Sequence, residues 1–208
     1  MHRAVQGESV PSIAAFYGFA DWHAVWEARE NESLRKKRSN PMIIYPGDEV
    51  SIPDREKGSF IIETGKLNII YLGKFQSLWL RLSLYDMDGE PLKEGEAYCI
   101  EFEGKKVKGT IKDNGLLEEQ IPCSVREAVL TIQGKSRKLL MGSLDPLDTV
   151  EGLWARLANM GYGSSDIRKS PDDELESAVR RFQIDYDLEP DGIPGPRTKA
   201  KIKKVYGC

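Results

Sequence analysis

The side chains that could perform covalent or metal chemistry are few and widely spaced in this chain. It has two histidines, His2 and His23, and three cysteines, Cys99, Cys123 and Cys208. A hydrolytic zinc centre needs several His and carboxylate ligands around an open position, and a cysteine nucleophile needs a neighbouring histidine to form its thiolate. Neither arrangement is indicated by these positions. We therefore expect no catalytic residues, no metal and no cofactor.

The acidic residues do not form a recognisable catalytic motif either. The chain contains 33 Asp and Glu residues, which is enough to supply the carboxylate pair of a glycosidase, but none lies in such a motif. Asp86-Met87-Asp88-Gly89 begins like a calcium loop. Its flanking helices and distal glutamate are missing, so we interpret it as a turn. An enzyme is the least favoured function.

Bulk properties are those of an ordinary globular protein. The 208 residues are 40% hydrophobic and 30% charged, with a formal charge of −3, so nucleic acid is not an expected partner. No apolar run approaches the roughly 20 residues of a membrane span. The segment 1–7 has no apolar signal core, and the odd cysteine count favours free thiols in a reducing compartment. We expect synthesis in the cytoplasm without ordinary secretion.

The C-terminal third has the pattern of three short helices. The segment 177–183 carries an apolar helical face, Asp191-Gly192 predicts a turn, and Thr198 is a candidate cap for a last helix over 199–205. An earlier helix, ending at Gly161, is predicted by an apolar stripe, which consists of Val150, Leu153, Trp154, Leu157 and Met160.

This order of elements resembles the small three-helix peptidoglycan-binding domain of cell-wall enzymes, over residues 146–208. The resemblance is carried by Leu153, Leu157, Gly161-Tyr162, Ala178-Val179, Phe182-Gln183, Asp191-Gly192, Gly195 and Thr198. The first Asp-Gly turn of the family is replaced here by the segment 169–174. The candidate binding residues that the resemblance implies are Tyr162, Gln183, Asp191 and Gly192.

The first fifty residues have the pattern strand, helix, helix, strand. Strands are expected at 3–5 and before Pro53, and helices at 10–17, capped by Ser9, and at 22–28. This order resembles a LysM domain, a module that binds N-acetylglucosamine polymers. The resemblance is carried by Gly7-Glu8-Ser9-Val10, Ile13-Ala14, Tyr17-Gly18, Asn31 and the run from Pro46 to Pro53.

The LysM resemblance implies a shallow glycan groove between two loops. Its candidate residues are Gly7, Glu8, Ser9 and Val10 in the first loop, and Ile44, Tyr45, Pro46 and Gly47 in the second. Tyr45 could pack against a sugar face, or it could be a half-buried turn residue; the glycines could serve the fold alone, and Ile44 could be a core residue. An insertion at 32–40 contains Arg35-Lys36-Lys37-Arg38. We interpret this run as a solvated loop, with contact to an anionic partner as the alternative.

The middle of the chain, residues 56–145, has the pattern of an antiparallel β-sandwich. Leu78, Leu80, Leu82 and Leu84 alternate with polar or aromatic residues, as in a strand with one buried face. The run 112–115 contains Asn-Gly and predicts a hairpin turn. With at least six strands expected, the layout resembles transthyretin-like or carrier-type sandwiches.

We therefore expect an α+β multidomain protein with divisions 1–55, 56–145 and 146–208. The three parts in this order resemble bacterial proteins that accompany type VI secretion or related contractile injection machinery. The first hypothesis is a non-catalytic protein that binds peptidoglycan or N-acetylglucosamine polymers and is delivered, with a toxin, to the periplasm or wall of a target cell. The alternative is a structural adaptor or chaperone that binds a secreted toxin or spike protein and has lost sugar binding.

Overall fold

The computed structural model describes residues 1–54, 62–67, 77–163 and 172–207. They pack as two compact units, one comprising Met1–Lys37 and Pro46–Ser143 and the other Arg38–Tyr45 and Leu144–Cys208. None of the helices in the described ranges is long and apolar enough to cross a membrane. The three-part division at residues 55 and 145 stays a prediction.

The N-terminal segment contains the expected strand, helix, helix and strand, each shorter than predicted, but two further helical elements, η1 and α3, lie between the second helix and the last strand. A two-stranded antiparallel ladder joins β1 and β2, with His2 opposite Val50 and Arg3 opposite Glu49. The predicted strand at 3–5 is shifted, since Ala4 lies beyond the ladder and bonds to Gly47 and Asp48. The elements are β1 (His2–Arg3), α1 (Val10–Phe16), α2 (His23–Trp26), η1 (Arg29–Asn31), α3 (Glu32–Lys37) and β2 (Glu49–Val50).

Helix α1 begins where the sequence predicts because Ser9 forms a capping box. The backbone N–H of Ser12 donates to Ser9 Oγ at 3.4 Å, and the Ser9 N–H donates to Ser12 Oγ at 2.9 Å. Val10 and Ile13 are fully buried. Tyr17, predicted on the same apolar face, is 37% exposed because the helix ends at Phe16.

The basic run in the insertion is helical, so its interpretation as a loop is wrong. Arg35, Lys36 and Lys37 form the last turn of α3, in which Lys36 Nζ lies 2.8 Å from Glu32 Oε1 one turn away, and Arg38 follows the helix. Arg35 Nη1 donates to the carbonyl of Ala28 at 2.8 Å and also to that of Trp26. These bonds satisfy the carbonyl of Trp26 at the end of α2 and that of Ala28 before η1, and so tie α3 to the preceding helices.

Asn31 ties this helical region to the second strand. The side chain is 1% exposed. Its Nδ2 donates to the carbonyls of Val25 at 2.7 Å and Ser51 at 2.8 Å, and its Oδ1 accepts the Ser51 N–H at 2.8 Å. Asn31 therefore has a structural role, because all of these bonds are to backbone groups of the same unit.

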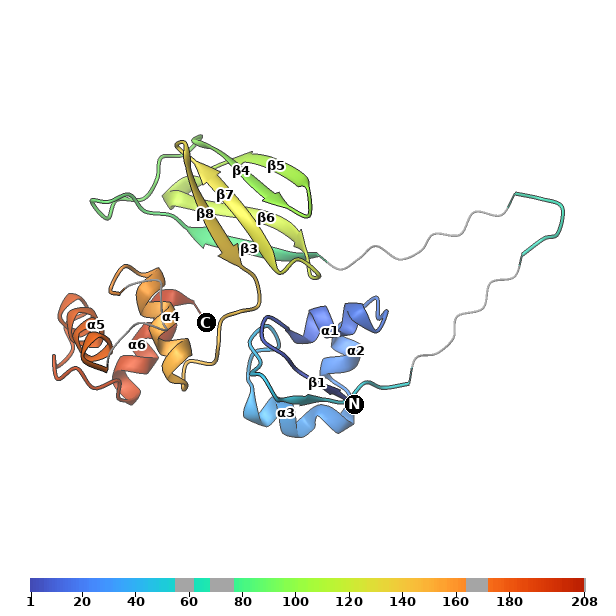
Figure 1. Cartoon of the computed structure of the whole chain (residues 1–208), viewed down its shortest axis with the longest axis horizontal. Coiled ribbons are helices and arrows are strands. Elements are labelled where there is room, and N and C mark those ends of the chain that lie inside the picture. The colour runs from blue at the N-terminus through green and yellow to red at the C-terminus, as the bar shows by residue number, and fades with distance from the viewer. Residues whose placement is uncertain (55–61, 68–76, 164–171, 208) are drawn as a thin grey trace. The chain divides into compact units, whose positions relative to one another are not determined.

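The second part of this unit is an antiparallel sandwich (Figure 1), as the alternating leucines predict. One sheet pairs β3 with β6, and the other has the order β5-β4-β7-β8. Ile100 and Leu130 of the larger sheet share one core with Leu117 of the smaller sheet. The strands are β3 (Ser77–Ser83), β4 (Ala97–Phe102), β5 (Lys105–Thr110), β6 (Leu116–Pro122), β7 (Glu127–Ile132) and β8 (Lys135–Leu140).

The predicted hairpin at 112–115 is wrong in its connection. Asn114 and Gly115 do have positive φ, 57° and 69°, within the short helix η2 (Asp113–Gly115). However, β5 pairs with β4 and β6 pairs with β3, so the turn carries the chain from one sheet to the other. The tight hairpins lie instead at Glu103-Gly104 and Gln133-Gly134, which also have positive φ.

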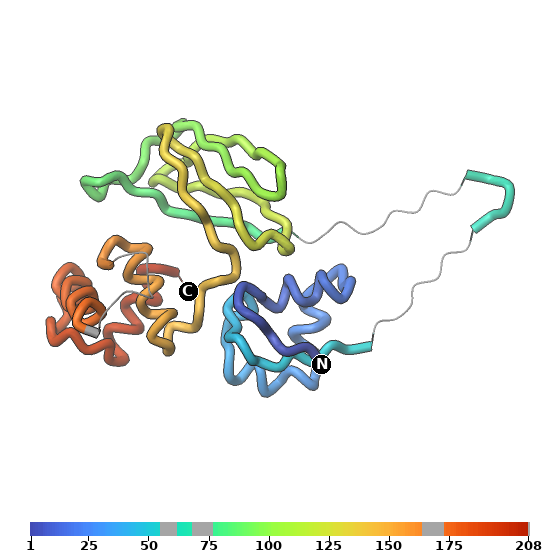
Figure 2. Tube along the Cα trace, viewed as in Figure 1, coloured from blue at the N-terminus to red at the C-terminus, as the bar shows by residue number. Residues whose placement is uncertain are grey.

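The described residues of the C-terminal unit form three helices, α4 (Val150–Asn159), α5 (Asp172–Asp185) and α6 (Pro196–Tyr206), traced in Figure 2. Thr149 caps α4 by accepting the Gly152 N–H at 3.0 Å, and Gly161 follows the helix with φ of 88°. One core unites α4, α5 and α6, which confirms the predicted apolar faces except at Val150, which is 61% exposed. The buried residues of this core are Leu153, Trp154, Leu157, Ala178, Val179, Phe182 and Ile202.

Thr198 is not the cap of the last helix. Helix α6 begins at Pro196, with Gly195 at the N-cap. Proline is well suited to a first helical turn because its fixed φ is already helical and its missing N–H is not needed there. Thr198 therefore lies inside the first turn, where it is buried and accepts a bond from Gln183. The segment 169–174, which replaces the first Asp-Gly turn of the family, is described only in part, because residues 169–171 lie outside the described ranges.

Candidate functional site

Most of the first predicted glycan loop serves the fold. Gly7 is buried with φ of 85°, Ser9 is used in the capping box, and the Val10 side chain is fully buried. A ligand at this loop could reach Gly7 or Val10 only through the backbone. Glu8 is the one residue of the four with a functional group that remains partly open.

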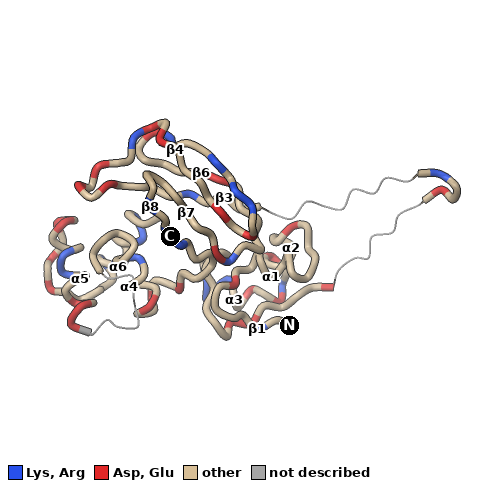
Figure 3. Tube along the Cα trace, turned by 45° about the horizontal axis from the view of Figure 1, so that its top comes forward, with Lys and Arg blue, Asp and Glu red and all other residues tan. Residues whose placement is uncertain are grey.

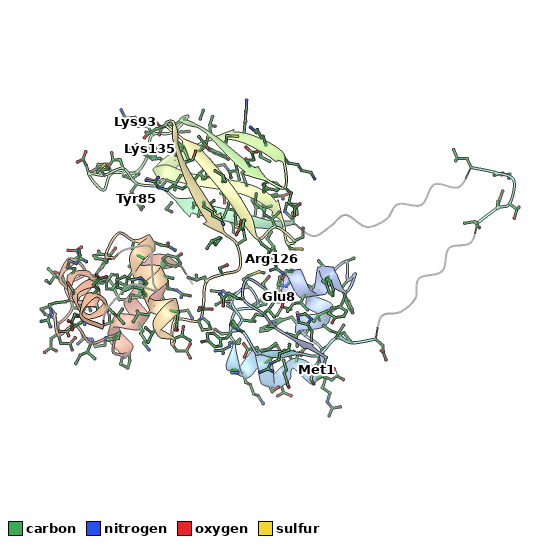
Figure 4. All side chains as sticks on the ribbon, in the orientation of Figure 1. Met1, Glu8, Tyr85, Lys93, Arg126 and Lys135 are labelled. Atoms are coloured by element: carbon green, nitrogen blue, oxygen red, sulfur yellow. The ribbon has the colours of Figure 1, made fainter. Side chains whose placement is uncertain are left out.

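Glu8 is held in a polar cluster that the sequence did not predict (Glu8 is labelled in Figure 4). Its Oε2 lies 2.8 Å from His2 Nε2 and accepts the Val5 N–H at 2.9 Å, while His2 Nδ1 lies 3.3 Å from Tyr17 Oη. Burial raises the pKa of Glu8, but the hydrogen bonds from His2 and Val5 outweigh it, and the net pKa is lowered. The carboxylate is therefore ionised at neutral pH.

The second predicted loop combines one buried residue with one accessible aromatic ring. Ile44 is 4% exposed, as its alternative interpretation as a core residue expects. Tyr45 is half-buried, and the Arg38 guanidinium lies 5.6 Å from its ring centroid. Arg38 therefore covers part of the ring that a sugar would use.

Pro46 and Gly47 form the turn that leads into β2. Gly47 has φ of 92°, and its N–H donates to the Ala4 carbonyl at 2.8 Å. The Ala4 N–H in turn donates to the Asp48 carbonyl at 2.8 Å. The turn is thus bonded to the strand that precedes Gly7, and glycine is needed because its φ is positive.

Three of the four residues predicted for the C-terminal site form one hydrogen-bond network. Gln183 Nε2 lies 2.7 Å from Asp191 Oδ1 and 3.1 Å from both Thr198 Oγ1 and the Ile193 carbonyl, and its Oε1 accepts the Gly192 N–H at 2.8 Å. The Gln183 side chain is 1% exposed. These groups therefore already have partners within the protein and hold the turn together.

The same network sets the charge of Asp191. The Ile193 N–H donates to Asp191 Oδ1 at 2.8 Å, beside the bond from Gln183. The pKa of Asp191 is lowered, chiefly by the backbone bond from Ile193 and then by Gln183. Since both donors favour the charged form, Asp191 is a carboxylate down to acidic pH.

Tyr162, the fourth predicted residue, makes different contacts. Its hydroxyl donates to Asp185 Oδ2 at 2.8 Å, and its ring meets Phe182 edge to face at 5.5 Å. Burial, and then the bond to Asp185, raises the pKa of Tyr162 above the usual value for a phenol. Tyr162 therefore stays protonated. It also lines a nearby hollow.

That hollow has a volume of about 370 Å³ and lies within the C-terminal unit. The sequence assigned Trp154 to the core and gave Arg181 no role. The Gly161-Tyr162-Gly163 run after α4 is the signal that could have indicated it, because glycines leave space beside a ring. The lining residues are Trp154, Gly161, Tyr162, Gly163, Glu174, Ser177 and Arg181.

Comparison with known families supports the C-terminal interpretation. Residues 147–202 match the model of a putative peptidoglycan binding domain. This range contains α4, α5 and most of α6, so the resemblance stated for 146–208 is confirmed and peptidoglycan is supported as a partner. No curated protein and no solved structure gives a significant match to the chain. The LysM, transthyretin-like and secretion-system resemblances stay predictions.

Proposed function

We propose that this protein attaches to the bacterial cell wall by binding peptidoglycan and has no wall-cleaving activity of its own. The observation that carries the proposal is the family match over residues 147–202. The single core formed by α4, α5 and α6 supports it, because a binding module needs its three helices assembled.

The N-terminal module is proposed as a second attachment site, for N-acetylglucosamine polymers. Its support is the presence of β1, α1, α2 and β2, with η1 and α3 inserted before β2, together with the half-buried ring of Tyr45. Two weak sites on one chain gain avidity on a repeating polymer when the linkage lets both engage.

A binding role without catalysis agrees with the surroundings of the nucleophilic and basic side chains. Burial raises the pKa of the Cys123 thiol, which opposes formation of a reactive thiolate. His2 is bonded to Glu8 and Tyr17, and His23 is stacked on Trp22 and lies 2.7 Å from Asp21 Oδ1. Acidic and basic residues are mixed along the chain (Figure 3), which suits neither nucleic acid nor a strongly charged partner.

We further propose that the protein is made in the cytoplasm and reaches the periplasm or wall with a toxin, through a contractile injection apparatus of the type VI kind. The support is the order of the three predicted parts. Co-purification of the protein with a secreted spike or toxin from a bacterium that carries such an apparatus would test this route.

Binding is tested by co-sedimentation of the purified protein with peptidoglycan sacculi. We expect the protein in the pellet, and expect competition by soluble wall fragments. Labelled sacculi incubated with the protein, with and without zinc, should release no soluble label. Release that disappears with a chelator would show that the protein is an enzyme.

An adaptor or chaperone is the second candidate. It is favoured by the exposed aromatic pair at the end of α1, where Phe16 is 79% exposed and Tyr17 is 37% exposed. An exposed aromatic surface of this kind is typical of protein contacts. This candidate would be supported if the protein bound a toxin or spike protein but remained in the supernatant when sacculi were sedimented.

A further inference from the structure

We propose that basic residues along one side of helix α6 form a contact surface for the carboxylates of the peptidoglycan stem peptides. We call this surface the α6 stripe; it consists of Arg197, Lys201 and Lys204. The inference rests on the proposed function and names the chemical groups of the wall that this part of the C-terminal unit would bind.

Helix α6 concentrates positive charge in a chain that is acidic as a whole. The formal charge of the protein is −3, yet α6 has basic side chains and no acidic one. The charge is therefore a local property of this helix. Its charged residues are Arg197, Lys199, Lys201, Lys203 and Lys204.

The basic side chains of α6 make no ion pair and no hydrogen bond within the described residues. Basic residues on other elements are often paired, as Arg180 is with Glu176 at 2.6 Å and Lys138 is with Glu127 at 2.7 Å. Lys201 Nζ lies 5.1 Å from the centroid of the Tyr186 ring, a contact that does not neutralise its charge. The positive charge of α6 is thus not compensated by the described part of the chain.

The spacing of the three residues places them along one side of the helix. Arg197, Lys201 and Lys204 are related as i, i+4 and i+7, which brings side chains above one another. Arg197 and Lys204 are exposed, whereas Thr198 and Ile202 are buried. The stripe is about 10 Å long, since a helix rises about 1.5 Å per residue.

The stability of the helix does not explain this arrangement. Lys204 lies in the last turn, where a cation is favoured by the helix dipole, but Arg197 lies in the first turn, where a cation is disfavoured. Arg197 and Lys201 also repel each other, because like charges at i and i+4 destabilise a helix. A stripe with an unfavourable first charge and no acidic partner in the described residues favours an anion outside the chain.

Carboxylates are the anionic groups of peptidoglycan itself, and their spacing fits the stripe. Alternate residues of an extended peptide are about 7 Å apart, and helical residues at i and i+4 are separated by about 6 Å along the axis. Arg197 and Lys201 also lie within the range 147–202 that matches the peptidoglycan binding family. The stripe is therefore part of the module for which peptidoglycan is the supported partner.

The charge of the whole chain favours carboxylates over a phosphate polymer. A nucleic acid or another densely charged phosphate polymer is attracted by a broad positive surface, and a chain of formal charge −3 repels it at long range. Stem-peptide carboxylates are more widely spaced along the wall. They need only a short positive surface, which α6 provides.

The test is co-sedimentation of the full chain with three preparations of sacculi. The first is untreated, the second is stripped of phosphate-containing polymers, and the third is stripped and has its carboxylates converted to neutral amides. The variant Arg197→Gln/Lys204→Gln removes two charges from exposed side chains, so the fold should be retained, which circular dichroism checks.

We expect the variant to bind stripped sacculi about fivefold more weakly than the parent at low salt, because two exposed ion pairs are lost. The difference should disappear at about 1 M salt, where charges are screened within about 3 Å. On amidated sacculi the variant and the parent should bind equally. Lys93→Gln/Lys135→Gln is the matched control, since both residues are exposed and lie in the other unit (Figure 4); it should bind like the parent.

The outcomes separate this inference from the proposed function. If the parent binds stripped sacculi and the α6 variant binds them equally well, the inference is overturned and the proposed function stands. An equal loss in the control variant, or a loss that persists on amidated sacculi, would also overturn the inference. A loss seen only with untreated sacculi would assign the stripe to phosphate polymers instead. Absence of parent binding to every preparation would overturn both.

Discussion

Gln183 and Gly192 are joined by a hydrogen bond of 2.8 Å in which the side-chain oxygen of a buried helical residue accepts the backbone N–H of a turn. The same side chain donates to Asp191 at 2.7 Å. One amide thereby holds both residues of the Asp-Gly turn against α5. Gly192 has φ of 76° and is buried. Because the Gly192 N–H cannot reach water, the Gln183 side chain accepts its hydrogen bond instead.

Replacing Gln183 by Met should destabilise the C-terminal unit by about 2–3 kcal/mol, because the N–H of Gly192 and the carboxylate of Asp191 lose partners while the volume is nearly conserved. Chemical denaturation followed by tryptophan fluorescence measures this. Gln120→Met on β6 is the control, since Gln120 is exposed, and should change stability by less than about 0.5 kcal/mol. Equal effects of the two variants would refute a structural role for the network.

The turn should also depend on pH. The pKa of Asp191 is lowered from an ordinary value of 3.8 in the folded state. The contribution of the Asp191 carboxylate to stability is therefore complete at pH values above the pKa of the unfolded state. It is lost as the pH falls through the lower pKa of the folded state. Thermal unfolding below about pH 4 should show this loss.

Asp191→Asn is the control for that titration. The amide introduced by this substitution still presents an acceptor to the Ile193 N–H, but it does not titrate. The variant should lose less stability than the parent when the pH is lowered from neutral to acidic values, and the Ile193 amide signal should shift with pH only in the parent. Identical acid profiles would show that the loss comes from other carboxylates.

The basic run provides a third prediction. Arg35→Ala should destabilise the protein by about 1–2 kcal/mol, because the carbonyls of Trp26 and Ala28 lose a donor. Lys36→Ala is the neighbouring control; it removes only an exposed ion pair with Glu32 and should cost less than about 0.5 kcal/mol. If both variants are as stable as the parent protein but bind an anionic partner more weakly, the basic run is a docking surface for that partner.

Much of the fold could be predicted from patterns of burial. The alternating leucines of β3 and, apart from the exposed Val150, the apolar stripe of α4 were identified correctly, because a strand or helix with one buried face must repeat its apolar residues at its own period. The pairing of strands was not predictable in this way. Asn114-Gly115 fixes local φ angles, which are present, but local angles do not determine which strand becomes the neighbour of β6.

The candidate sites show a different limit. Ser9, Gln183 and Asp191 are polar residues at the positions that the two resemblances indicate, yet each makes hydrogen bonds that hold its own turn or helix. A sequence gives the type of a side chain but not whether its donors and acceptors are already paired. Trp154 illustrates the converse, since its place in an apolar stripe predicted burial and gave no sign that its N–H lacks an acceptor among the described residues.

The last prediction concerns Tyr45. If the N-terminal module binds glycan, Tyr45→Ala should weaken chitooligosaccharide binding by about 1–3 kcal/mol, because the half-buried ring is the aromatic surface of the predicted groove. Isothermal calorimetry measures the loss, and circular dichroism checks that the fold is retained. Tyr85→Ala is the matched control, because Tyr85 is 59% exposed and lies outside the predicted groove.

Arg38 makes this prediction sharper. Its guanidinium lies 5.6 Å from the Tyr45 ring centroid, so a sugar must either displace it or stack on the free part of the ring. Arg38→Gln should strengthen binding in the first case and leave it unchanged in the second. Weaker binding by Arg38→Gln would mean that the arginine itself contacts the ligand. Unchanged binding by Tyr45→Ala would remove Tyr45 from the site, whatever the result for Arg38.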